Sequence, residues 1–313
     1  MDLPSSNMSP SPKASPSSKV SHLSNMENLH VEKTKPDKYG QRHVNENPDL
    51  ISRQLLLLED YLAKLAPDES TGIKEAEERC PSIVGSDEHK LAFLRSEMFN
   101  AKLAAKRFAK YWNKRIELFG EKAFMPLTID GSMSDEDIVA LSTGFASVLP
   151  GKDETGRALV WVDASFLDTT KYSRESMIRA LMYIEEAVLE DESVQRKGVI
   201  FINYNGNNPK FSQFDRRMIS MWASSTKGCM PIRVSAIYIL QIPTLFVVLL
   251  NLLKYLLGIR LAKRLLVIPG TNEQNLRCLV KRGIPKESLP TEIGGDFMLK
   301  QEAWVNERKQ AGK

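Results

Sequence analysis

The sequence predicts an α/β fold, in which an N-terminal helical bundle is followed by a mixed, mostly parallel sheet flanked by helices. Four short runs rich in apolar and β-branched residues indicate strands, at 158–163, 198–204, 234–240 and 264–269. The second run, GVIFINY, is apolar without alternation, as in a strand buried on both faces of a parallel sheet. Between the first two runs, apolar residues from Met177 to Val188 recur at helical spacing. Strands that alternate with helices need crossover connections, which favours parallel pairing.

Two helical stretches precede the sheet. Between Asp49 and Ala66, leucines recur at spacings of three and four residues until Pro67, which predicts an amphipathic helix. A longer helix is predicted from Ser86 to Phe119, with one apolar face. Its other face carries the cations Lys102, Lys106, Arg107 and Lys110. Because a basic helix face is most simply explained by solvation, we assign it no binding role.

Composition divides the chain of 313 residues into four parts. The first 20 residues contain seven Ser and four Pro, so we expect residues 1–48 to form a disordered tail. This tail also lacks the apolar stretch of a signal peptide. The other three parts are an N-terminal helical region at 49–120, a sheet-containing domain at 135–297 and a C-terminal tail at 298–313.

The cysteines and histidines limit the chemistry that the chain can perform. Cys80, Cys229 and Cys278 form no CxxC pair, which indicates free thiols in a reducing cytoplasm. All four histidines lie at or before His89. Histidine-based triads and histidine metal sites are therefore not expected in the sheet-containing domain, and neither phosphate-binding glycine motif occurs. We expect no enzyme, no cofactor and no metal.

A lipid-modifying enzyme stays open only with chemistry that needs no histidine. Glu185, Glu186 and Glu190 lie at helical spacing and could supply carboxylates, but we interpret them as a solvated face. The formal net charge of +4 is too small to indicate nucleic-acid binding by the whole chain.

The most apolar stretch, residues 236–257, is long enough to cross a bilayer. Pro243, however, favours a strand that ends near Gln241 and a new helix from Thr244 to Leu257. Such a helix is about 21 Å long, short of the roughly 30 Å hydrocarbon core. Its surface is apolar almost all round, so it is a core helix, a movable lid over a lipid cavity or, if Pro243 is tolerated, a transmembrane segment.

Cations follow this stretch at helical spacing. Arg260 and Arg264 are four residues apart and share one helix face, with Lys263 alongside. The two arginines repel each other unless an anion lies between them, and phosphate fits the planar donor fork of arginine. A solvated basic face is the alternative.

Several stretches together resemble the CRAL-TRIO lipid-binding family, over residues 50 to 297. They are FLRSEMFNAKLAAKRFAKYWNKR (93–115), DETGRALVWV (153–162), MPIRVSAIYILQIPTLF (230–246) and LPTEIGG (289–295). Their order and spacing carry the resemblance, which is closest to the branch that includes tocopherol transfer protein and cellular retinaldehyde-binding protein.

The resemblance implies that the sheet forms the floor of a hydrophobic lipid pocket and that the helix from Thr244 to Leu257 is its gate. The expected pocket and gate residues are Phe246, Val247, Leu250, Leu253 and Leu257. In the tocopherol-transfer branch, basic residues at the positions of Arg233, Arg260 and Arg264 hold a phosphoinositide headgroup. Lys263 lies beside them in the sequence.

The chain departs from the family pattern at several positions. The resemblance implies a basic residue where Glu97 stands, which weakens that edge of the headgroup site. Ile232 replaces the carboxylate with which the yeast branch holds inositol, which argues against phosphatidylinositol as the pocket ligand. Asn203 and Ile293 replace a family Asp and Tyr.

We therefore expect a soluble cytoplasmic protein that carries a small hydrophobic ligand and docks peripherally on phosphoinositide-bearing membranes, without a transmembrane segment or a nucleic-acid partner. The alternative is a phosphoinositide-sensing adaptor in membrane trafficking that binds lipid but does not transfer it.

Overall fold

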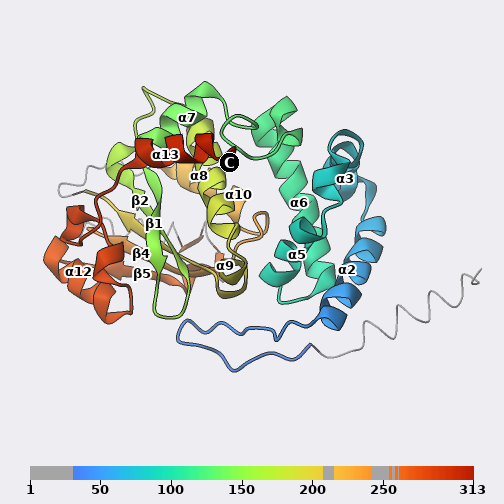
Figure 1. Ribbon diagram of the computed structural model, residues 1–313, viewed down its shortest axis with the longest axis horizontal. Helices are drawn as coiled ribbons and strands as arrows, with labels where there is room; N and C mark the ends of the chain where they lie inside the picture. Colours follow the sequence, from blue (N-terminus) through green and yellow to red (C-terminus); the bar gives the residue numbers. More distant parts are fainter. Residues whose placement is uncertain (1–30, 207–214, 242–253, 256–257, 260) are drawn as a thin grey trace, which may run out of the picture.

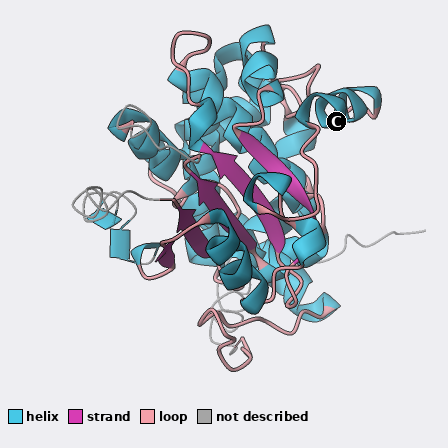
Figure 2. Cartoon of the chain, turned by 90° about the vertical axis from the view of Figure 1, so that its left-hand side faces the viewer, coloured by secondary structure: helices cyan, strands magenta, loops and turns pink. Residues whose placement is uncertain are grey.

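A five-stranded sheet forms the centre of the molecule (Figure 2). The computed structural model describes residues 31–206, 215–241, 254–255, 258–259 and 261–313. Its strands lie in sequence order: β1 (Ala146–Lys152), β2 (Ala158–Asp163), β3 (Val199–Tyr204), β4 (Val234–Leu240) and β5 (Leu265–Ile268). The first strand is antiparallel to β2, and the other pairs are parallel. The mixed, mostly parallel sheet of the predicted fold is confirmed.

The four predicted strands are present, whereas β1 was not predicted. The interior strand β4 is buried along its whole length, as its apolar run indicates. Strand β1 contains Pro150 and Gly151, and Gly151 takes a φ of +72°. Its pairing with β2 shifts register between Val148 and Lys152. An edge strand interrupted in this way lacks the continuous pattern by which strands are recognised in a sequence.

Helices cover both faces of the sheet, as the crossover connections require. Successive strand residues point to opposite faces, so Val160 and Leu159 belong to different core clusters. One face packs against α8 (Arg174–Leu189) and α10 (Arg216–Thr226), where the rings of Phe201 and Trp222 lie 5.6 Å apart. The other face packs against α12 (Asn272–Lys281) through Leu279.

The N-terminal helices pack together beside the sheet domain (Figure 1). They are α2 (Pro48–Ala63), α3 (Pro67–Arg79), α4 (Pro81–Val84), α5 (Asp87–Ser96) and α6 (Ala101–Phe119). The helix predicted from Ser86 to Phe119 is thus two helices. Met98 and Phe99 take φ values of +52° and +57°, and the Phe99 N–H closes α5 on the Leu94 carbonyl at 2.7 Å. The Asn100 side chain then caps α6 by accepting a hydrogen bond from the Leu103 N–H at 3.0 Å.

Residues 31–47, which the composition assigned to the tail, form an extended strap beneath the sheet (Figure 1). Gln41 Nε2 donates to the Val234 carbonyl at 3.2 Å, and Tyr39 donates to Asp153 at 2.9 Å. Asp37 pairs with the buried Arg157. The composition predicted disorder because residues 31–47 can bury little apolar surface. The strap is held instead by polar contacts, which composition does not reveal.

The remaining helices complete the sheet domain. They are α7 (Asp135–Ser142), α9 (Glu192–Lys197) and α13 (Gln301–Gln310). Helix α13 lies within the predicted C-terminal tail, and its Arg308 pairs with Glu190 of the segment after α8 at 2.6 Å. In the part of the chain that the structure describes, no helix combines the length and apolarity needed to cross a bilayer.

Candidate functional site

A basic cavity of about 680 Å³ lies between α6, the strap, the start of β4 and the turn before β5. We call it the first cavity. Its wall carries seven cations: Arg42, Lys106, Arg107, Lys110, Lys227, Arg233 and Arg264. Glu97 is the one carboxylate among the described residues that line it. This excess of positive charge indicates a site for an anion.

Arg233 is the most deeply placed of these cations, with 9% of its surface exposed. It directly precedes β4, and its guanidinium donates to the carbonyl of Arg42 in the strap at 2.6 Å and to that of Arg196 at 2.5 Å. Burial, with further contributions from Arg157 and Arg264, lowers its pKa to about 10. The group therefore stays charged at neutral pH and is held in a fixed orientation.

Arg264 approaches Arg233 from the turn before β5. Its Nη1 donates to the Val234 carbonyl, and its own carbonyl accepts from the Ile237 N–H at 2.9 Å. Two of the three arginines predicted as headgroup ligands, Arg233 and Arg264, are 31 positions apart in the chain and are thus brought together at the N-terminal end of β4.

Glu97 does not leave an unpaired negative charge on the cavity wall. Arg107 donates to it from Nε at 2.7 Å, and Arg107 Nη1 donates to the Met230 carbonyl at the same distance. The carboxylate that replaces a family base is therefore neutralised by a cation from the next helix.

The basic face of α6, which we interpreted as solvated, forms one wall of the cavity. Lys106, Arg107 and Lys110 all line it. Both lysines are exposed, and neither has an acidic partner among the described ion pairs. Their spacing places them on one helix face, but the sequence could not show that this face opposes β4.

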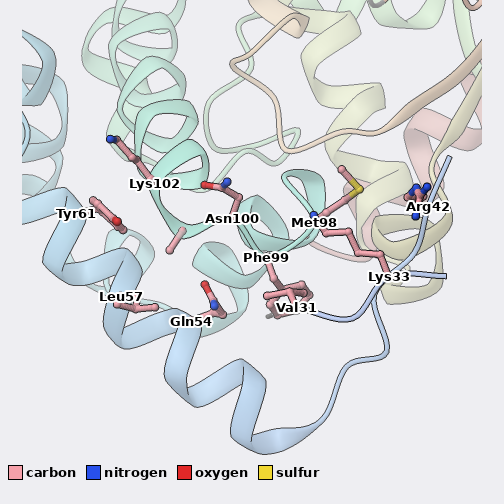
Figure 3. A pocket seen from close by; sticks show the side chains of 11 residues that line it. Val31, Lys33, Arg42, Gln54, Leu57, Tyr61, Met98, Phe99, Asn100 and Lys102 are labelled. Atoms are coloured by element: carbon pink, nitrogen blue, oxygen red, sulfur yellow. The ribbon is translucent and has the colours of Figure 1, made fainter. Parts of the chain in front are cut away.

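A smaller pocket of about 440 Å³ adjoins the first cavity and shares Arg42 and Met98 with it. Figure 3 shows Lys33 and Arg42 of the strap near Met98 of the turn between α5 and α6. Val31 and Leu57 also line this pocket, and Lys102 lines it rather than the first cavity. The basic face of α6 is therefore divided between two adjacent hollows.

Exposed apolar side chains border the first cavity. Leu103 and Ile259 line it with 43% and 74% of their surfaces exposed. Tyr255, four residues before Ile259, is 82% exposed. The first cavity therefore carries exposed apolar side chains beside its cations.

Of the other predicted site residues, the structure describes only Lys263. Arg260 and the gate residues Phe246, Val247, Leu250, Leu253 and Leu257 lie outside the described residues. Lys263 does not line the first cavity; it lies in a separate hollow with Lys38 and Tyr238. Ile232, at the position of the yeast-branch carboxylate, lines the first cavity and is buried.

The described residues show no group of histidines, cysteines and carboxylates that could hold a metal ion. His89 packs edge-on against the rings of Phe93, Phe108, Tyr111 and Trp112. Burial lowers its pKa to about 3, so it is a neutral core residue.

The carboxylates interpreted as a solvated face do not share one environment. Glu185 is fully buried, and it accepts hydrogen bonds from Thr226 at 2.8 Å and Trp222 at 3.2 Å. Glu190 is exposed and paired with Arg308. The solvated interpretation is wrong for Glu185, because α10 covers that part of α8.

A model of the CRAL/TRIO domain family matches residues 142–295. This chain carries a CRAL/TRIO domain. The family is a lipid-binding one, so lipid binding is the broad function that the domain brings. Arg233 and Arg264 belong to the CRAL/TRIO domain, whereas Arg42, Lys106 and Lys110 precede it. The first cavity therefore lies where the N-terminal segments meet the CRAL/TRIO domain.

Several curated proteins are similar to the chain over most of its length. Clavesin-1 of Xenopus laevis is 26% identical over 260 residues, which cover 82% of this chain and 71% of that protein. Clavesin-1 of Mus musculus is 27% identical over 259 residues, covering 80% of this chain and 66% of that protein. Clavesin-2 of Homo sapiens is 26% identical over 255 residues, with coverages of 80% and 71%. The crystal structure of Sfh5 matches 86% of this chain and all of that one, at 11% identity and a TM-score of 0.48.

Proposed function

We propose that the protein carries a small hydrophobic ligand in its CRAL/TRIO domain and docks on phosphoinositide-bearing membranes through the first cavity. The observation that carries the proposal is the convergence of seven cations on one cavity. Among the described residues that line this cavity there is a single carboxylate, which is already paired. A phosphoinositide headgroup presents several phosphates on a compact ring, which matches cations placed around a hollow.

The charge geometry favours phosphate over a single carboxylate. Arg233 and Arg264 supply guanidinium groups from the β-sheet side of the cavity, and Lys106 and Lys110 line it from α6. Each such cation contributes on the order of 1 kcal/mol near an anionic membrane surface. Several together provide reversible, peripheral attachment.

Apolar contact supports a lipid headgroup rather than a free phosphate as the anion. The exposed Leu103 and Ile259 lie on the wall of the same cavity and would enter the interfacial region when a headgroup is bound. Burial of apolar surface contributes about 25 cal/mol per Å², so even two side chains add to the charge term.

In this proposal the hydrophobic ligand binds in the lipid pocket that the resemblance to the family implies, beneath the gate helix. In this proposal Phe246, Val247, Leu250, Leu253 and Leu257 cover it, and Arg260 completes the headgroup site with Arg233 and Arg264. Docking would let the gate open into the membrane, where the ligand exchanges. The protein would then be cytoplasmic and peripherally membrane-associated.

Mass spectrometry of lipids released from the purified full-length protein identifies the ligand. Transfer of that lipid is then measured between phosphatidylcholine donor vesicles and acceptor vesicles with or without phosphatidylinositol bisphosphate. We expect a copurifying hydrophobic molecule, and faster transfer to the acceptors that carry the phosphoinositide.

Two results would change the proposal. Binding to phosphoinositide vesicles without any transfer would replace the carrier with a sensing adaptor. Transfer at the same rate to both acceptors would remove the docking role of the first cavity.

A further inference from the structure

The pocket of about 440 Å³ lies where α2, the turn between α5 and α6 and the start of the strap meet (Figure 3). We call it the N-terminal pocket. Its wall includes Val31, Lys33 and Arg42 of the strap, Gln54 of α2, and Asn100 and Lys102 at the start of α6. All of its described lining residues precede residue 142, where the match to the CRAL/TRIO domain begins. The pocket therefore lies outside the domain that brings lipid binding.

The positive charge of the N-terminal pocket has no acidic counterpart among its described lining residues. Lys33, Arg42 and Lys102 line it, and all three are exposed. None of them takes part in an ion pair found among the described residues. Glu32 lies between Val31 and Lys33 in the chain but does not line the pocket. Cations gathered around a hollow raise the local concentration of an anion.

Hydrogen-bond donors without a partner lie at the same pocket. The Asn100 side chain takes up only the Leu103 N–H, so the N–H groups of Ala101 and Lys102 have no acceptor among the described residues. Gln54 is 5% exposed, and its amide has no hydrogen-bond partner among the described residues. A carboxylate only accepts hydrogen bonds, so it suits these N–H groups and the positive end of the α6 dipole.

The chain itself holds a carboxylate within reach of this pocket. Val31 is the first residue that the structure describes, and it packs against the hydrophobic core. Glu27 precedes it by four residues, so the two Cα atoms lie within about 14 Å of each other in any conformation. Glu27 and Asp2 are the only carboxylate side chains in residues 1–31. A group tethered this closely has an effective concentration on the order of 1 mM, which favours it over a separate partner.

We propose that residues 26–30 (MENLH) bind in the N-terminal pocket, with the Glu27 carboxylate at the start of α6 between Lys33 and Lys102. Met26 and Leu29 supply apolar side chains for the partly exposed Val31 and Met98 of the wall. The segment is thus an internal ligand of the helical region.

Binding of this segment also affects the first cavity, a consequence that rests on the proposed function. Arg42 lines both hollows. Glu27 brings a negative charge beside Arg42, so the bound segment lowers the attraction of the first cavity for an anionic headgroup. Release of the segment restores that attraction. The segment is therefore a removable brake on membrane docking.

Hydrogen–deuterium exchange of the full-length protein, followed by mass spectrometry, tests the binding of the segment. The amides of residues 26–30 are expected to exchange about tenfold or more slowly than in a synthetic peptide of residues 20–31. In Glu27→Gln, and in Lys33→Ala with Lys102→Ala, they should exchange at nearly the rate of the peptide.

Two matched controls should keep the protection. Glu32→Gln removes a neighbouring carboxylate, and Lys35→Ala with Lys74→Ala removes two exposed lysines; none of these residues lines the pocket. Exchange in the wild type at the rate of the peptide would overturn the proposal. Equal loss of protection in the variants and their controls would overturn it as well, because the effect would then come from total charge.

A vesicle assay tests the brake separately. Glu27→Gln is expected to bind phosphatidylcholine vesicles that carry phosphatidylinositol bisphosphate about fivefold more tightly than the wild type, and Glu32→Gln is expected to bind like the wild type. Equal binding of Glu27→Gln and the wild type would overturn the brake. Absence of vesicle binding in every variant would overturn the proposed docking function and the brake with it, whereas the exchange experiment would still decide whether the segment binds.

Discussion

Arg107 forms hydrogen bonds with both Glu97 and the loop that leads into β4. Its Nε donates to the Glu97 carboxylate at 2.7 Å, and its Nη1 donates to the Met230 carbonyl at 2.7 Å. Glu97 therefore takes up part of the positive charge that α6 presents to the first cavity. Removal of its negative charge should strengthen the site.

Glu97→Gln is expected to tighten binding to phosphoinositide vesicles by about fivefold, the equivalent of about 1 kcal/mol for one charge near the membrane. Sedimentation at physiological salt measures the change. Glu117→Gln is the control, because Glu117 pairs with Lys114 on the same helix but lies outside the cavity. Weaker binding of Glu97→Gln would mean that the carboxylate mainly orients Arg107.

Lys106→Ala with Lys110→Ala is expected to weaken phosphoinositide-vesicle binding by about tenfold or more, because two exposed cations of the cavity wall are lost. The thermal unfolding midpoint should change little, since neither lysine has an acidic partner among the described ion pairs. Lys74→Ala with Lys114→Ala removes the same charge outside the cavity. If both double variants lose affinity equally, only the total charge matters and the cavity has no special role.

Glu185 should make the stability of the protein depend on pH. Burial raises its pKa to about 7 despite hydrogen bonds from Thr226 and Trp222. Between about pH 4.5 and about pH 7 the folded state keeps a proton that the unfolded state has lost, so stability falls as pH rises through this window. The loss can reach about 3 kcal/mol.

Glu185→Gln should remove this part of the pH dependence, because the amide does not ionise. Urea unfolding at several pH values across the window measures the free energy of unfolding. Identical slopes for the wild type and the variant would show that Glu185 ionises normally in the folded protein.

Asp37 should act in the opposite direction. Burial alone would raise its pKa, but hydrogen bonds from His43, Arg157 and the main-chain N–H groups of Gln41 and Tyr39 outweigh it, and the pKa lies well below the ordinary value. Its contribution to stability is therefore present above about pH 4 and is lost as pH falls further.

Asp37→Asn should lower the free energy of unfolding at neutral pH by about 2 kcal/mol and make the decline in acid less steep. The strap should also become more sensitive to limited proteolysis. An unchanged cleavage pattern would indicate that Asp37 does not hold the strap.

The strands show which parts of the fold can be predicted from local sequence patterns. The runs that became β2 and β4 were predicted because their apolar residues are continuous and both strands lie inside the sheet. Strand β1 escaped prediction because Pro150 and Gly151 interrupt it. The strap was not predicted because Gln41 and Tyr39 form hydrogen bonds with partners more than 100 positions away in the chain.

Some residues of the candidate site could be predicted from the sequence, and others could not. Arg233 and Arg264 were identified through the resemblance to a family whose motif they match. Lys106 and Lys110 could not be chosen from the sequence, because their role depends on which surface opposes α6. The contact between Arg107 and the Met230 carbonyl, 123 positions apart, fixes that relation. Only the tertiary structure distinguishes a solvated basic face from a cavity wall.

In the proposed function, phosphate geometry, and not charge alone, attracts the protein to membranes. The direct test compares wild-type binding to vesicles that carry phosphatidylinositol bisphosphate with binding to phosphatidylserine vesicles of equal surface charge, at physiological salt. We predict binding about tenfold or more tighter to the phosphoinositide vesicles, because Arg233 and Arg264 are held in place to receive phosphate. Equal binding to the two kinds of vesicle would show that charge alone attracts the protein to membranes.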